Sequence, residues 1–129
     1  MNPLNAIPVF YDARMVADAR SYSPSAGKPR EVVASWQAMH VPLVFKLFDP
    51  ATREQLALAH SRDFVNGVLE GRIPNGFDNL STSVAHALPW TSGAMLAAAR
   101  EALGNGQVAV APVAGFHHAH YEQASGYCT

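Results

Sequence analysis

The chain has 129 residues, of which nine are Lys or Arg and ten are Asp or Glu, and its formal net charge is -1. This length corresponds to one domain with enough residues to bury a core. The balanced charge provides no basic surface for a phosphate backbone, so the composition argues against nucleic-acid binding.

Cysteine content and the N-terminus bear on the compartment. Cys128 is the single cysteine, which excludes an internal disulfide and fits a reducing environment. The first residues have neither the basic region nor the apolar region of a signal peptide, and no apolar run approaches the length of a bilayer span. We therefore expect one cytoplasmic domain over residues 1–129 with no membrane partner.

The first half of the chain predicts two strands and a helix. Residues 7–11 are apolar and aromatic, which favours a strand beginning after Pro8. Turn-forming residues fill 21–29, and Pro29 with Glu31 suits the first turn of a helix. Residues 41–48 form a second apolar run and predict a second strand.

The second half is mainly helical. Asp49 or Thr52 can cap a helix over 53–60, Ser61 can cap the next helix, and residues 71–79 form a loop. A long helix is expected over about 82–103, kinked or split at Pro89 and ended by the glycines at 104 and 106. Large apolar side chains at helical spacing are expected to pack in the core: Trp36, Met39, Trp90 and Met95.

Residues 108–113 are continuously apolar, as in a strand covered on both faces, and predict a third strand. The order strand, helix, strand, helices, strand predicts an α/β fold, a three-layer sandwich with a parallel sheet. Ligand sites in such sheets form beyond the carboxyl ends of the strands. The segment that follows the third strand is therefore the expected site.

That segment contains adjacent histidines, His117 and His118, followed by a Gly126-Tyr127-Cys128 step. Imidazoles exchange protons near neutrality, so two of them facing one pocket can act as base and acid. Histidines in such a position are also commonly loop or capping residues. His120 adds a third imidazole, either toward a metal cluster or as an exposed loop residue, and Cys128 with His118 could form a nucleophile and base.

Together these residues resemble the active-site loop of the zinc-dependent histone deacetylase and acetylpolyamine amidohydrolase family. The resemblance implies a partial arginase/deacetylase fold with about three strands in the order 2-1-3. It assigns His117 and His118 as catalytic residues, with Phe116, Gly126 and Tyr127 in substrate binding and Cys128 as a structural residue. Residues 60–65 and the loop 74–79 are also similar to family segments, and the latter would border the pocket.

The resemblance also implies Zn²⁺ and an acetylated lysine or polyamine as substrate. The family's zinc ligands are two aspartates and a histidine, two of them in an Asp-x-His motif, and this sequence contains no such motif. We therefore expect a truncated, N-terminal portion of a deacetylase-like domain that holds no family-type metal site and is inactive alone.

The alternative is a non-catalytic, oligomerising or regulatory α/β domain. In the order 2-1-3 the third strand lies at an open edge of the sheet, and an exposed apolar edge promotes association. We therefore expect self-association through the edge near Val108–Val113.

Overall fold

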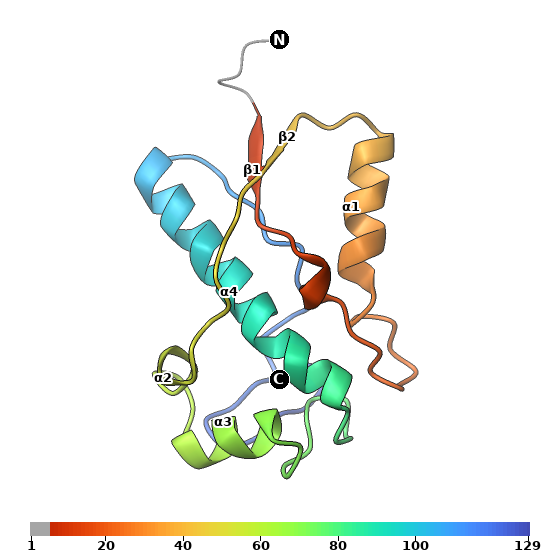
Figure 1. Cartoon of the computed structure of the whole chain (residues 1–129), viewed down its shortest axis with the longest axis vertical. Helices are drawn as coiled ribbons and strands as arrows, with labels where there is room; N and C mark the ends of the chain where they lie inside the picture. Colours follow the sequence, from red (N-terminus) through yellow and green to blue (C-terminus); the bar gives the residue numbers. More distant parts are fainter. Residues whose placement is uncertain (1–5) are drawn as a thin grey trace.

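A short parallel sheet and one long helix organise the chain (Figure 1). The computed structural model describes residues 6–129. The expectation that the first residues form no signal peptide concerns residues 1–5 as well, which lie outside the described range. Within it, no helix combines the length and hydropathy that a membrane span requires. The elements are β1 (Ile7–Val9), the 3-10 turn η2 (Ala13–Met15), α1 (Lys28–Ala38), β2 (Leu43–Phe45), α2 (Arg53–Leu56), α3 (Arg62–Leu69) and α4 (Thr82–Asn105).

The sheet has the predicted parallel order. β1 pairs with β2 in register, with Ile7 opposite Leu43. On the other side of β1, Val9 forms a parallel bridge with Val110. The Val110 amide donates to the Pro8 carbonyl at 2.9 Å, and the Phe10 amide donates to the Val110 carbonyl at 2.8 Å. The three segments therefore lie in the order 2-1-3.

The prediction of a continuous third strand over 108–113 is wrong in extent, because pairing there is a single bridge. Two prolines explain it. In a parallel ladder alternate residues bond to the same neighbour, so the next bonds would come from the amides of Pro8 and Pro112. Proline has no N–H to donate, so the ladder stops on both sides of Val110.

Helices cover both faces of the strands, and Figure 1 shows α1 and α4 on opposite sides of β1. The main core lies between β1, η2 and α4, where Phe10 and Met15 pack against Ala94 and Ala98. Phe48 extends this core through edge-to-face contacts with the rings of Phe10 and Trp90. The arrangement agrees with the predicted three-layer sandwich, with a smaller sheet.

Helix α4 is continuous across Pro89, so the predicted split does not occur. The Pro89 carbonyl accepts a hydrogen bond from the Ala51 amide at 2.8 Å, which fixes the segment after β2 against the helix. The helix ends as predicted: Gly106 adopts a left-handed φ of 65° and its amide donates to the Ala102 carbonyl at 2.9 Å.

The predicted caps of the two shorter helices are confirmed. Thr52 Oγ1 accepts from the Gln55 amide at 3.1 Å, and the Gln55 side chain accepts from the Thr52 amide at 2.9 Å, which forms a capping box. Ser61 Oγ accepts from the Phe64 amide at 3.2 Å. Helix α2 is shorter than predicted and ends after one turn.

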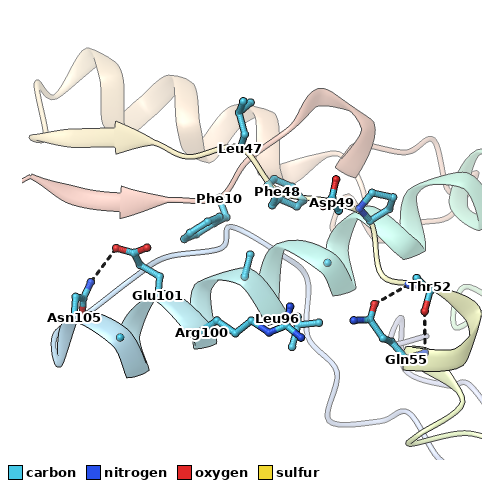
Figure 2. A pocket seen from close by; sticks show the side chains of 14 residues that line it. Phe10, Leu47, Phe48, Asp49, Thr52, Gln55, Leu96, Arg100, Glu101 and Asn105 are labelled. Carbon is cyan, nitrogen blue, oxygen red and sulfur yellow. Dashed lines mark hydrogen bonds between the residues drawn. The ribbon is translucent and has the colours of Figure 1, made fainter.

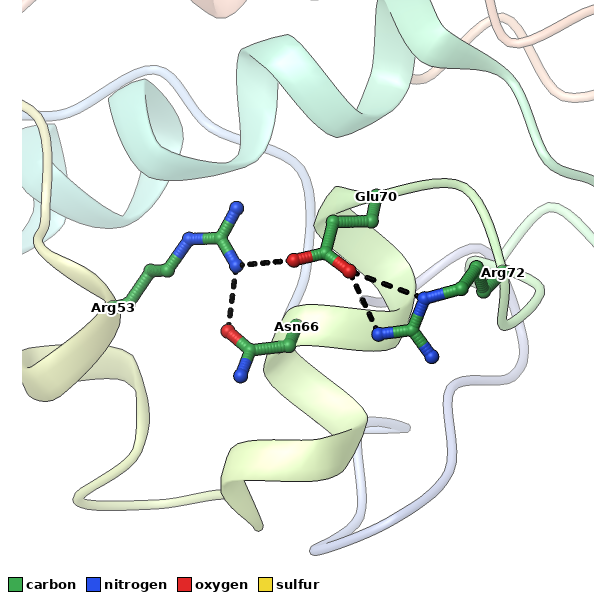
Figure 3. A network of polar contacts seen from close by, with 4 residues as sticks. All are labelled: Arg53, Asn66, Glu70 and Arg72. Carbon is green, nitrogen blue, oxygen red and sulfur yellow. Dashed lines mark hydrogen bonds and ion pairs between the residues drawn. The ribbon is translucent and has the colours of Figure 1, made fainter.

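A polar network joins α2 to α3 (Figure 3). Arg53 donates to Asn66 at 2.6 Å and to Glu70 at 2.9 Å, while Arg72 donates to the second oxygen of Glu70 at 2.7 and 3.1 Å. The hydrogen bonds from Arg72 and then from Arg53 lower the pKa of Glu70. The three charged side chains are exposed, so the network orients the two helices and adds little stability.

A second charged pair joins the end of β1 to α4. Arg14 donates to both carboxylate oxygens of Asp12, at 2.8 and 2.7 Å, and its guanidinium lies 3.5 Å from the centre of the Trp90 ring. The Arg14 hydrogen bond lowers the pKa of Asp12 from 3.8 to about 2. Because the folded pKa is the lower one, this pair stabilises the fold above pH 3.8 and the contribution disappears as the pH falls to about 2.

Candidate functional site

The two predicted catalytic histidines lie together on a bent loop at the carboxyl end of the third segment of the sheet. Their ring centroids are 4.0 Å apart, and the ring planes are inclined by 45°. A turn in which the Ala119 amide donates to the Phe116 carbonyl at 3.0 Å bends the backbone between them. Both side chains are exposed, so both imidazoles can reach solvent or a ligand.

One groove contains three of the five predicted site residues. His117, Gly126 and Tyr127 line a groove of about 550 Å³ beside the third segment of the sheet. Helix α1 forms its other wall through Val32 and Trp36. The groove therefore brings an imidazole and an aromatic ring to one concave, partly apolar surface.

Phe116 lies away from this groove. It lines an apolar cavity of about 370 Å³ together with Phe64 and Leu88, and a smaller cavity of about 50 Å³ together with Met15 and Tyr127. Phe116 and Tyr127 thus line the same small cavity. The substrate-binding role of Phe116 stays a prediction.

The loop 74–79 contacts the turn that contains Tyr127, while none of its residues lines the groove of about 550 Å³. The Tyr127 amide donates to the Gly76 carbonyl at 2.8 Å, and the Gly76 amide donates to Thr129 Oγ1 at 2.8 Å. The rings of Phe77 and Tyr127 are 5.7 Å apart. Asn75, which is 4% exposed, holds the loop by donating to the Asn79 side chain at 3.1 Å.

Sequence analysis did not identify Trp36 and Phe77 as site residues. Trp36 was assigned to the core, because its spacing on the helix gives no sign that this face borders a groove. Phe77 stands in a turn-forming sequence whose partner, Tyr127, is far along the chain. Neither the place of Trp36 in the groove wall nor the contact of Phe77 with Tyr127 has a signal in the nearby sequence.

His60 and Cys128 have structural environments. His60 Nδ1 lies 2.7 Å from the His120 carbonyl oxygen, which requires that this nitrogen carry the proton and donate. Its ring also packs on Phe64, with centroids 5.5 Å apart. Cys128 is 3% exposed, which agrees with the structural assignment and makes the nucleophile alternative unattractive.

A zinc site needs at least three protein ligands, commonly His, Cys, Asp or Glu. Among residues 6–129, the structure brings together no group of three such side chains. The described residues therefore do not fit a zinc ion. They supply a histidine pair and a groove that one of these histidines lines.

Comparisons with known proteins agree with this architecture. Residues 28–129 match the family model described as histone deacetylase domain. The fold is similar to the crystal structure of the HDA15 HD domain, with a TM-score of 0.77, 19% identity, and coverage of 96% of this chain and 40% of that one. The chain therefore spans well under half of that solved chain. No curated protein matches it.

Proposed function

Because this chain belongs to the histone deacetylase domain family, we propose that it supplies the histidine half of a deacetylase site, which residues outside the chain complete. The observation that carries the proposal is the pair of exposed imidazoles, 4.0 Å apart, of which His117 lines the groove together with Tyr127. An acetylated lysine or polyamine fits it, since either presents an apolar chain to a groove wall and an amide to the imidazoles.

The chain's own residues have separable roles in this proposal. Tyr127 and Trp36 form apolar walls for the alkyl part of the substrate, while His117 and His118 exchange protons with the attacking water and the leaving amine. The family is generally zinc-dependent, and zinc supplies Lewis-acid chemistry when bound. Since the described residues do not form that centre, we assign no step of the metal to this chain.

We expect the purified chain, supplied with zinc, to show no turnover of acetyl-lysine peptides or acetylpolyamines. A fusion to the remaining part of a histone deacetylase domain, such as that of the HDA15 HD domain, is expected to restore hydrolysis. In that fusion His118→Ala should lower kcat about 10²–10⁴-fold, the range for loss of a general acid or base.

His86→Ala is the matched control, since His86 is an exposed histidine on α4. It should leave turnover unchanged. Hydrolysis that survives the combined change His117→Ala and His118→Ala would contradict the assignment. Zinc-dependent turnover by the chain alone would contradict the proposal that residues outside the chain complete the site.

One observation favours the second candidate function, a non-catalytic domain that oligomerises. The Val110 amide and carbonyl both bond to β1, so the backbone groups of Ala109 and the Ala111 amide point to the opposite side, while the Ala111 carbonyl accepts from the Val113 amide at 2.9 Å. The Val108 side chain beside them is 66% exposed. These groups can pair with the same segment of a second copy.

If this edge mediates self-association, sedimentation velocity should show a concentration-dependent dimer that Val108→Lys weakens, because a charge on an edge opposes pairing. Leu58→Lys is the control, since Leu58 is 88% exposed and lies between α2 and α3. A monomer at all concentrations, or equal weakening by both changes, would rule out this edge.

A further inference from the structure

We propose that Gly126 is a positioning residue for His118, an inference that rests on the proposed function of the histidine pair. Gly126 and Tyr127 have left-handed φ values of 55° and 64°. They are the two central residues of a tight turn closed by an antiparallel bridge between Ser125 and Cys128. Such a turn needs positive φ at both positions, and glycine adopts it without strain.

The His118 ring occupies the space that a side chain at position 126 would need. A β-carbon on Gly126 would lie 2.6 Å from Cδ2 and 2.9 Å from Cγ of His118, and 3.2 Å from its Cβ. These atoms are near the root of the side chain. Rotation of the ring about the Cβ–Cγ bond leaves Cγ in place, so it cannot relieve the overlap.

The same turn also holds the backbone of His118. Ser125 Oγ donates to the His118 carbonyl at 3.1 Å. The turn is itself fixed, because the Tyr127 amide donates to the Gly76 carbonyl at 2.8 Å. Ser125 therefore holds the main chain of His118 while Gly126 leaves room for its ring, and together they set where this imidazole stands relative to His117.

The test compares Gly126→Ala with Gly106→Ala. Gly106 has a similar left-handed φ of 65°, but no atom lies within 4 Å of the position of an added β-carbon. Both changes carry the same backbone strain, and only the first displaces a neighbour. In the purified chain, the ring Cδ2–Hδ2 resonance of His118 should shift in Gly126→Ala and stay in place in Gly106→Ala.

A kinetic comparison in the fused enzyme separates a positioning role of Gly126 from a role as a wall of the substrate groove. Displacement of a catalytic group by about 1 Å costs on the order of 100-fold in rate, so Gly126→Ala should lower kcat by about that factor with little change in KM. A wall residue without a positioning role would instead raise KM and leave kcat unchanged.

Ser125→Ala keeps the inference testable if Gly126→Ala does not fold, because it removes a hydrogen bond without adding an atom. It should shift the carbonyl-carbon and ring resonances of His118. Unmoved His118 resonances in the folded variants would overturn the inference. An inactive wild-type fusion with shifted resonances would instead overturn the proposed function and leave the positioning role intact.

Discussion

Gly93→Ala is expected to lower the free energy of unfolding by about 3 kcal/mol, the upper part of the usual range for overpacking. Gly93 lies on the face of α4 that meets the segment after β2. An added β-carbon would overlap the Asp49 carbonyl oxygen and lie 2.9 Å from the Ala51 nitrogen. These are backbone atoms, so the segment must move and lose the bond from the Ala51 amide to the Pro89 carbonyl.

Gly104→Ala in the same helix is the matched control, because no atom lies within 4 Å of its added β-carbon. It should stabilise the chain by up to about 1 kcal/mol, since alanine favours a helix more than glycine. Urea unfolding followed by circular dichroism at 222 nm measures both changes. Equal midpoints for the two variants would show that α4 does not approach the 49–51 segment so closely.

Gly93 and Asp49 also line an open groove, which Figure 2 shows from close by. Phe10 and Phe48 line it on the side of the strands, and Leu96 and Arg100 line it from α4. Movement of the 49–51 segment would therefore widen this groove as well. Widening of the groove would disturb first the edge-to-face contact of Phe10 with Phe48, whose ring centroids are 6.2 Å apart.

Met15→Ala is expected to cost about 2–5 kcal/mol, as for other large-to-small changes in a core. Met15 is 1% exposed and belongs to the cluster of Phe10, Ala94 and Ala98. It also lines the small cavity that Phe116 and Tyr127 line, so its removal enlarges that cavity. The expected result is a lower unfolding midpoint together with broadened Tyr127 resonances.

Met39→Ala controls for the general effect of removing a methionine, because Met39 is 65% exposed. Its change in stability should stay within about 0.5 kcal/mol. Comparable losses from Met15→Ala and Met39→Ala would contradict the placement of the core between η2 and α4.

Much of the fold follows from local sequence rules. Ser61 and Thr52 cap helices through short-range hydrogen bonds, and Gly106 ends α4 through a left-handed residue, so each is visible in its own sequence. Whether a side chain is buried depends less on the nearby sequence. Met39 and Met95 occupy apolar helical positions and yet are 65% and 41% exposed, because helical spacing does not say which face meets the rest of the chain.

The sequence predicted where the histidine pair lies in the fold, and its catalytic role stays a prediction. The pairing of His117 and His118 beyond the third segment follows from strand order and their adjacency. The support from Gly76 and Phe77 could not be predicted, because it depends on how a loop between helices meets a turn some 50 positions away. The single bridge at Val110 depends on the positions of Pro8 and Pro112 in the pairing register, which the sequence does not specify.

The hydrogen bonds around the site also govern when it can form during folding. The Gly76 amide bonds to Thr129 across 53 positions, and both the Asn79 bond to the Ala19 carbonyl and the His60 bond to the His120 carbonyl span 60. Closing loops of this size costs chain entropy before any contact compensates for it. We therefore expect the histidine pair to take its final geometry only after the helices have docked, and a nascent chain lacking residues 120–129 not to hold it.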